Sequence, residues 1–194
     1  MKIISFIHRR ILNNKIFDSI VIQAVENNID KIVVNTIDLL DKKILNRVLD
    51  LQRAYKELDV IVKEIVREDF LGGILSTLQL FEDGDFLVID LDCNLDYIDI
   101  KKFFSHTDAL GVSRKVRCGY SYSFDLDDKG NVVNVHTGLK DDYVFSGIAK
   151  LGGGFIETLR RLLILYYNPE YIKFENLITT YLRRGGVIKA ISID

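Results

Sequence analysis

The amino-acid sequence predicts an α/β fold in which helices cover both faces of a mixed sheet. In the first half of the chain, short apolar runs rich in β-branched residues alternate with segments whose apolar residues recur at helical spacing. This alternation is typical of a parallel sheet with right-handed helical crossovers. After Asp92 the rhythm changes to shorter strand-like runs, which predict an antiparallel extension of the sheet.

The first half supplies the alternating elements. Runs such as KIVVNT and DFLVIDL are apolar throughout, as in strands that are buried on both faces. In the first predicted helix the apolar stripe is Ile16, Ile20, Ala24 and Val25. The predicted order is a strand over 1–7, a helix over 15–28, a strand over 31–36, a helix over 41–57, a strand over 59–66, a helix over 70–81 and a strand over 85–91.

The second half is less regular. Residues 109–135 hold two or three strand-like runs, and Asp127-Asp128-Lys129-Gly130 has the composition of a hairpin turn. Two helices over 154–167 and 174–183 and a last strand over 187–193 complete the prediction.

Composition limits the classes of function. The 194 residues, 48% of them hydrophobic, suffice for one domain over 1–194. A net charge of −2 offers no general attraction to nucleic acid or to an anionic membrane, and no apolar run approaches the about 20 residues that span a bilayer. Cys93 and Cys118, in a chain without a leader-like start, predict a cytoplasmic protein with reduced thiols.

Acidic residues close the last strand of the parallel half. Residues two apart on an extended chain point to the same side, so we expect Asp90 and Asp92 to converge on one divalent cation. Carboxylate oxygens select Mg²⁺ or Mn²⁺, which would bridge the phosphates of a nucleotide. The alternative is that Asp90 and Asp92 are ordinary solvated acids at the end of a strand.

Basic residues and glycines stand at other strand ends. Arg9 and Arg10 follow the first strand and could bind phosphate, because guanidinium matches phosphate oxygens bidentately. Gly72 and Gly73 open a helix and would let a ligand approach the backbone closely. The alternatives are that Arg9 and Arg10 are ordinary solvated surface charges and that Gly72 and Gly73 form a plain turn. The histidines and cysteines lack zinc spacing, and no serine lies in a Gly-x-Ser-x-Gly elbow.

Taken in order, these segments resemble the sugar-1-phosphate nucleotidylyltransferase family. KIFDSIVIQAVENNIDKIVVNT is similar to the family's helix and second strand, and FLVIDLD to the strand that ends in its metal-binding aspartate, here Asp92. DYVFSGIAKL resembles the strand with a sugar-contacting glycine, here Gly147. FENLITTYLRRGGVIKAISID resembles the ending that places a sugar-contacting glutamate at Glu175, and Gly72-Gly73 stand where the family has a glycine beside the base.

The resemblance implies a three-layer, Rossmann-like fold of the nucleotide-diphospho-sugar transferase (GT-A-like) type. It also implies Mg²⁺-assisted attack by a sugar phosphate on the α-phosphate of an NTP, with release of pyrophosphate. Asp92 would be the catalytic and metal-binding residue, with Asp90 beside it. The expected partners are an NTP and a sugar phosphate or nucleotide sugar, with a second copy of the chain or another protein left open.

Two departures from the family pattern shape the hypotheses. The G-x-G-T-R loop is missing after the first strand, so Arg9, Arg10 and Lys15 would take over phosphate binding. The family's second metal-binding aspartate lies just beyond its last strand, where this sequence stops at Asp194. The leading hypothesis is a nucleotidyltransferase. The alternatives are a catalytically silent relative that binds a nucleotide, nucleotide sugar or protein, and a glycosyltransferase-type domain with an Asp-x-Asp metal site.

Overall fold

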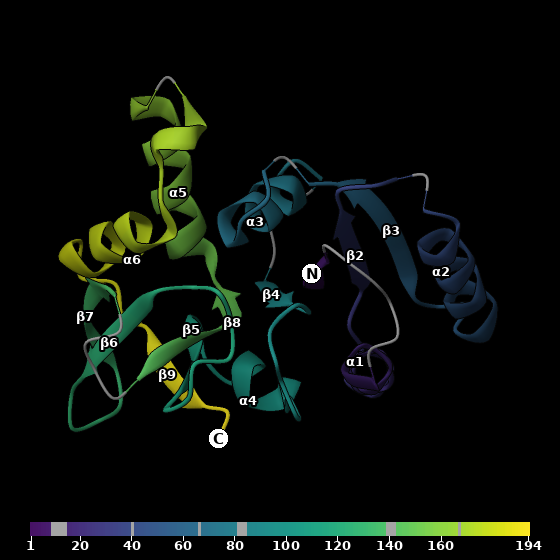
Figure 1. Ribbon diagram of the computed structural model, residues 1–194, viewed down its shortest axis with the longest axis horizontal. Helices are drawn as coiled ribbons and strands as arrows, with labels where there is room; N and C mark the ends of the chain where they lie inside the picture. Colours follow the sequence, from purple (N-terminus) through teal and green to yellow (C-terminus); the bar gives the residue numbers. More distant parts are fainter. Residues whose placement is uncertain (9–14, 40, 66, 81–84, 139–142, 167) are drawn as a thin grey trace.

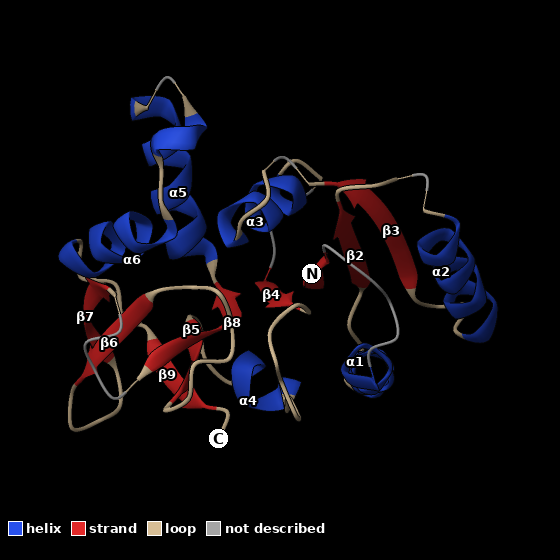
Figure 2. Cartoon of the chain, viewed as in Figure 1, coloured by secondary structure: helices blue, strands red, loops and turns tan. Residues whose placement is uncertain are grey.

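The described residues of the computed structural model form one sheet of nine strands with helices on both faces (Figures 1 and 2). The structure describes residues 1–8, 15–39, 41–65, 67–80, 85–138, 143–166 and 168–194. The strands are β1 (Lys2–His8), β2 (Lys31–Thr36), β3 (Asp59–Glu64), β4 (Asp85–Asp90), β5 (Ala109–Ser113), β6 (Tyr122–Leu126), β7 (Val132–Thr137), β8 (Val144–Leu151) and β9 (Lys189–Ser192).

The strand order β3-β2-β1-β4-β8-β5-β9 combines a parallel half with a mixed half. Strands β1 to β4 are parallel to one another, β8 is antiparallel to both β4 and β5, and β9 is parallel to β5. The hairpin β6–β7 joins the sheet through β8. The prediction of a mixed α/β sheet is therefore confirmed.

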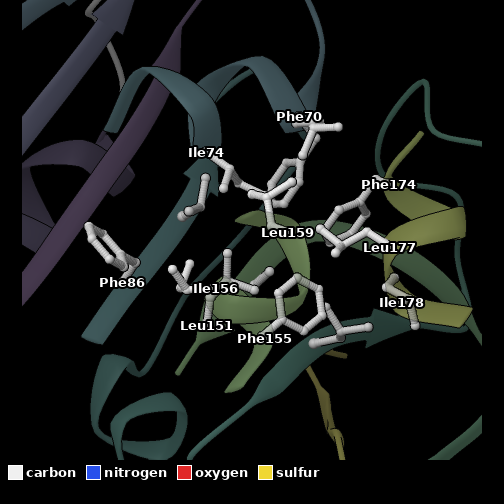
Figure 3. Packing of buried hydrophobic residues seen from close by; sticks show 14 of the residues in the cluster. Phe70, Ile74, Phe86, Leu151, Phe155, Ile156, Leu159, Phe174, Leu177 and Ile178 are labelled. Carbon is white, nitrogen blue, oxygen red and sulfur yellow. The ribbon is translucent and has the colours of Figure 1, made fainter. Parts of the chain in front are cut away.

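The sheet divides the apolar core into two layers, and helices cover each of them. The helices are α1 (Lys15–Glu26), α2 (Lys42–Ala54), α3 (Phe70–Leu78), α4 (Ile100–Phe104), α5 (Gly153–Leu165) and α6 (Phe174–Arg183), with a 3₁₀ turn η1 (Pro169–Tyr171). Apolar side chains of α3, α5 and α6 pack on one face of the sheet, and those of α1, α2 and α4 pack on the other. Figure 3 shows the first layer, where Phe70 and Ile74 of α3 meet Leu159 of α5 and Phe174 of α6.

Several details differ from the predictions. The buried stripe of α1 is Phe17, Ile20, Val21 and Ala24, so Val25 lies outside it with 41% of its surface exposed. Helix α1 is apolar on more than one side, and its periodicity alone did not fix which side faces the sheet. The short helix α4 was not predicted. Among the described residues, no helix has both the length and the apolar character needed to cross a membrane.

Candidate functional site

The carboxyl ends of β1, β4, β5 and β9 lie at one edge of the sheet. Strand β8 runs the other way, so its first half comes to this edge and places Gly147 beside Asp90. In open α/β sheets ligands bind beyond the carboxyl ends of the parallel strands. This carboxyl-side edge therefore carries the candidate site.

Asp90 and Asp92 occupy different environments at this edge. Asp90 is the last residue of β4 and only 2% exposed, and its Oδ1 accepts a hydrogen bond from the Asp92 backbone N–H at 2.9 Å. The Tyr120 hydroxyl donates to its Oδ2. Asp92 lies in the following turn and is exposed. Because the chain turns after Asp90, the two-residue alternation of a strand does not extend to Asp92.

The Asp90 carboxylate thus fixes the turn that presents Asp92. This geometry favours Asp92 as the metal-facing acid and Asp90 as a positioning residue, whereas the sequence predicted that both would face one cation. Within the described ranges, no three His, Cys, Asp or Glu side chains come together as a metal cage. A single exposed carboxylate still fits Mg²⁺, which takes most of its ligands from substrate phosphates and water.

Gly147 interrupts β8 with a bulge next to Asp90. Its φ of +79° lies in the left-handed region, and the β5–β8 register shifts at this point. A Cβ on Gly147 would lie 2.3 Å from Cys93 Sγ and 3.0 Å from Cys118 Sγ. The space beside its α-carbon is therefore filled by sulfur, and the sugar contact implied by the resemblance stays a prediction.

Cys93 and Cys118 form a disulfide, so the prediction of reduced thiols is wrong for this structure. The cysteines are 25 residues apart and not in a short motif, and only the strand order brings the loops after β4 and β5 together. The cytoplasmic location expected with the reduced thiols stays a prediction.

A row of aromatic residues leads from Asp90 to Glu175. The rings of Tyr120 and Tyr122 stack with centroids 6.2 Å apart, and Phe70 packs edge-on against Tyr120. Glu175, in the first turn of α6, is 9% exposed, and its Oε2 has no hydrogen-bond partner. Burial and the Glu175 charge raise the pKa of Tyr122 to about 12. Glu175 is thus a buried acid beside the same cluster, and its sugar-binding role stays a prediction.

The start of α3 borders this cluster. Asp69 caps the helix through the Gly72 N–H at 2.8 Å, and its charge also raises the pKa of Tyr122. A Cβ on Gly72 would lie 1.9 Å from the Arg67 carbonyl oxygen, and one on Gly73 would lie 2.3 Å from the Ile7 side chain. Close packing of protein against protein explains both glycines, and their contact with a base stays a prediction.

The predicted phosphate-binding residues are less well placed. Arg9 and Arg10 lie outside the described residues. Lys15 begins α1, is exposed, and borders a shallow hollow that Tyr97 of the loop after β4 also lines. A larger hollow, of about 580 Å³, lies between the ends of α1 and α2 at the opposite edge, and none of the predicted site residues lines it. We place the site by its chemistry rather than by hollow size.

Sequence reasoning missed Arg117, which ties three segments of this edge together. Its guanidinium donates to the Asn94 carbonyl at 3.0 Å and to Asp96 at 2.8 Å, and it lies 3.3 Å from an Asp194 carboxylate oxygen. Asp194 also accepts from Ser113 Oγ at 2.5 Å. The signal was the basic run Arg114-Lys115-Val116-Arg117 directly after a strand. Tyr120 and Tyr122, expected to be ordinary core, were missed too.

Comparison with known proteins identifies the fold. No known family and no curated protein matches the chain in sequence. Many solved structures match this chain, among them three that match over nearly its whole length. They are the CTP:phosphocholine cytidylyltransferase of Streptococcus pneumoniae (11% identity, TM-score 0.68, 100% of this chain and 90% of that one), the inositol-1-phosphate CTP transferase of T. maritima (12%, 0.67, 100% and 86%), and the nucleoside-diphosphate-sugar pyrophosphorylase of Vibrio cholerae RC9 (11%, 0.64, 99% and 92%).

The chain has the fold of the sugar-phosphate nucleotidyltransferases. The fold implied by the sequence resemblance is therefore confirmed. At about one identical residue in nine, the likeness to these nucleotidyltransferases concerns the fold and leaves the roles of single side chains to be tested.

Proposed function

We propose that the protein transfers a nucleotidyl group from an NTP to a sugar phosphate or a similar phosphorylated head group. A phosphate oxygen of the acceptor attacks the α-phosphorus, a new P–O bond forms, the bond to the β-phosphate bridging oxygen breaks, and pyrophosphate leaves. The observation that carries this proposal is the turn after β4. There the buried Asp90 carboxylate and the Tyr120 hydroxyl fix the backbone of an exposed aspartate at the carboxyl-side edge of a nucleotidyltransferase fold.

The described residues divide the work of binding. Asp92 would hold Mg²⁺ or Mn²⁺ together with the phosphates, and the bound ion would neutralise charge at the reacting phosphates. Glu175 is proposed to accept hydrogen bonds from sugar hydroxyls, which the lack of a hydrogen-bond partner at its buried Oε2 supports. Arg9, Arg10 and Lys15 are proposed to contact phosphate. Nothing in the described site favours the silent-relative alternative, so it enters as an outcome of the test.

The test compares Asp92→Asn with Asp128→Asn, an exposed aspartate in the β6–β7 turn. Nucleotide binding is measured by calorimetry with each common NTP, with and without Mg²⁺, and turnover by pyrophosphate release with a panel of sugar phosphates. We expect Asp92→Asn to abolish Mg²⁺-dependent binding while the free energy of unfolding stays within about 1 kcal/mol, since an exposed acid adds little to folding. Asp128→Asn should change neither the Mg²⁺-dependent nucleotide binding nor the free energy of unfolding.

Three results would redirect the proposal. Nucleotide binding without pyrophosphate release for any acceptor would favour the silent relative. No binding of any nucleotide by the wild type, in either redox state, would overturn the proposal. Loss of folding in Asp92→Asn would show a structural role for Asp92.

The proposed phosphate contacts have their own test. Changing Arg9 and Arg10 together to alanine should weaken NTP binding at least about tenfold, because charge-assisted contacts of this kind contribute about 1.5–3 kcal/mol each. A nucleoside should lose less. Equal losses for NTP and nucleoside would remove the phosphate role.

A further inference from the structure

We propose that the Cys93–Cys118 disulfide is a redox lock on the candidate site. In the disulfide form, residues 114–121 are held against the turn after β4. Reduction releases this segment and opens the hollow beside Asp92 to a nucleotide-sized ligand. The identity of the ligand rests on the proposed function, whereas the release of the segment does not.

The disulfide joins two loops that have little regular structure of their own. Cys93 lies in the turn after β4, and Cys118 lies in residues 114–121, which form neither helix nor strand. Next to the disulfide, the Asn94 N–H donates to the Arg117 carbonyl at 2.8 Å, and the Arg117 guanidinium donates to the Asn94 carbonyl. The disulfide is the covalent part of this bridge between the loops.

The closed bridge leaves little room beside Asp92. The hollow there has a volume of about 100 Å³ and is lined by Asp90, Asp92, Cys93, Cys118, Gly119 and Tyr120. Sites for small-molecule ligands usually measure about 300–1,000 Å³. Both disulfide-bonded residues are walls of this hollow, and their sulfur atoms cover the α-carbon of Gly147 at the bulge. The walls that limit the hollow are therefore the atoms that a redox reaction can separate.

The ties that remain after reduction are weaker. The Arg117 guanidinium pairs with Asp96 and with Asp194, whose side chains are 82% and 28% exposed, and water screens ion pairs whose partners are exposed. The Tyr120 hydroxyl remains hydrogen-bonded to Asp90. Segment 114–121 would then be held only by these noncovalent contacts and by the packing of the Tyr120 ring against Phe70, which can open and close on the time scale of loop motion.

The chemistry needs a dithiol reductant as co-reactant. One thiolate of the reductant attacks a disulfide sulfur, a mixed disulfide forms, and the second thiol of the reductant displaces the protein sulfur. The Cys93–Cys118 bond breaks, the protein gains two electrons and two protons as two thiols, and the reductant leaves as its own disulfide. Cys118 is half-buried in the wall of the hollow, which gives a small dithiol access to the bond.

The experiment compares the air-oxidised protein, the same protein in dithiothreitol, and the double variant Cys93→Ser/Cys118→Ser. Intact mass, lower by two hydrogens in the disulfide form, establishes the redox state. Amide hydrogen exchange at Asn94 reports opening, and the Gly152 amide, which is bound to Asp108 outside the two linked loops, serves as an internal control. Binding of each NTP, of UDP-glucose and of CDP-choline with Mg²⁺ is measured by calorimetry.

On reduction, Asn94 should exchange roughly tenfold faster while Gly152 changes little. Ligand affinity should rise at least about tenfold. The serine variant should match the reduced protein in both measurements and should not respond to dithiothreitol. The variant's thermal unfolding transition verifies that it is folded.

Each other outcome is decisive. Unchanged exchange at Asn94, equal affinity in both redox states, or failure of the air-oxidised protein to form the disulfide would overturn the lock. Faster exchange on reduction with no ligand bound in either state would support the lock on the segment and overturn the proposed nucleotidyl transfer. The two ideas therefore fail separately.

Discussion

Each of the two edges of the central sheet buries an aspartate that accepts a hydrogen bond from a tyrosine. The edges differ in how fully the charged groups around that aspartate are paired. At the carboxyl-side edge Tyr120 donates to Asp90. At the amino-side edge Tyr181 donates to Asp108 at 2.8 Å. Helix α6 spans the distance between the edges, because it carries Glu175 in its first turn and Tyr181 in its last.

At the amino-side edge, the buried charged groups are hydrogen-bonded to neighbouring residues of the protein. Lys150 is 1% exposed and donates to Asp85 at 2.9 Å and to the Thr107 carbonyl at 2.8 Å. The second oxygen of Asp108 accepts the Gly152 N–H at 2.7 Å. The carboxyl-side edge instead leaves Asp92 exposed and one Glu175 oxygen without a partner. The proposed function predicts from this contrast that one set of charges serves folding and that the other binds a ligand.

The largest expected effect is on the amino-side edge. Lys150→Met keeps the apolar stem but leaves the buried Asp108 without its nearby cation, so we expect the free energy of unfolding in urea to fall by about 3 kcal/mol. The matched control is Lys31→Met, which breaks the exposed pair with Asp59 and should cost less than about 1 kcal/mol. Equal losses would contradict the buried-network interpretation.

Removing the two tyrosine hydroxyls compares the edges directly. Tyr120→Phe and Tyr181→Phe each leave a buried carboxylate oxygen without its donor, at a cost of about 1–3 kcal/mol in unfolding free energy. Only Tyr120→Phe should also weaken Mg²⁺-dependent nucleotide binding, because Asp90 holds the turn of Asp92. If both variants bind nucleotide like the wild type, Tyr120 has no role in positioning Asp92.

The pH dependence of stability should have opposite signs at the two edges. Burial raises the pKa of Asp108 above its usual 3.8, whereas the Arg114 N–H and the Ser113 hydroxyl lower the pKa of Asp194. A raised folded-state pKa means that the unfolded chain loses its proton first, so stability falls as pH rises from 3.8 through the folded value. A lowered folded-state pKa means that stability is lost as pH falls below 3.8 through the pKa of the folded state.

Two asparagine variants separate these contributions. The stability of the wild type relative to Asp108→Asn should decrease as pH rises above 3.8, and relative to Asp194→Asn it should decrease as pH falls below 3.8. Urea unfolding at a series of pH values measures both differences. The same sign for both variants would contradict the assignment of the two carboxylates.

The regular elements could be predicted because their signals are local. β-Branched runs marked β2 and β4, and apolar spacing marked α2. The strand β8 was expected only from the family resemblance. Its apolar run is interrupted at Gly147, where the bulge requires a residue that adopts a positive φ.

The candidate site was only partly predictable because its contacts are long-range. Asp92 could be marked from its position after a strand, and Gly147 from the family resemblance. The contacts of Tyr120 with Asp90 and of Cys93 with Cys118 depend on the order β4-β8-β5, which sets two distant loops side by side. Spacing along the chain carries no information about that neighbourhood.

The smallest expected change in stability is at Glu175. Its Oε2 is buried without a hydrogen-bond partner, and an uncompensated buried carboxylate opposes folding. Glu175→Gln removes the charge at nearly constant shape, so the free energy of unfolding should stay the same or rise by up to about 1 kcal/mol. Tyr122 should titrate closer to the usual tyrosine range, because the Glu175 charge is the second cause of its raised pKa after burial.

The same variant should weaken binding of a nucleotide sugar more than binding of the corresponding NTP, since Glu175 is proposed to contact only the sugar. Calorimetry on the reduced protein measures both affinities, and Glu26→Gln, at the exposed end of α1, is the control for removing one negative charge. A protein that keeps a costly buried acid for a ligand becomes more stable and binds less when that acid is neutralised. If Glu175→Gln instead lowers stability and leaves the binding of both ligands unchanged, Glu175 belongs with the structural charges of the amino-side edge, and the contrast between the two edges does not extend to it.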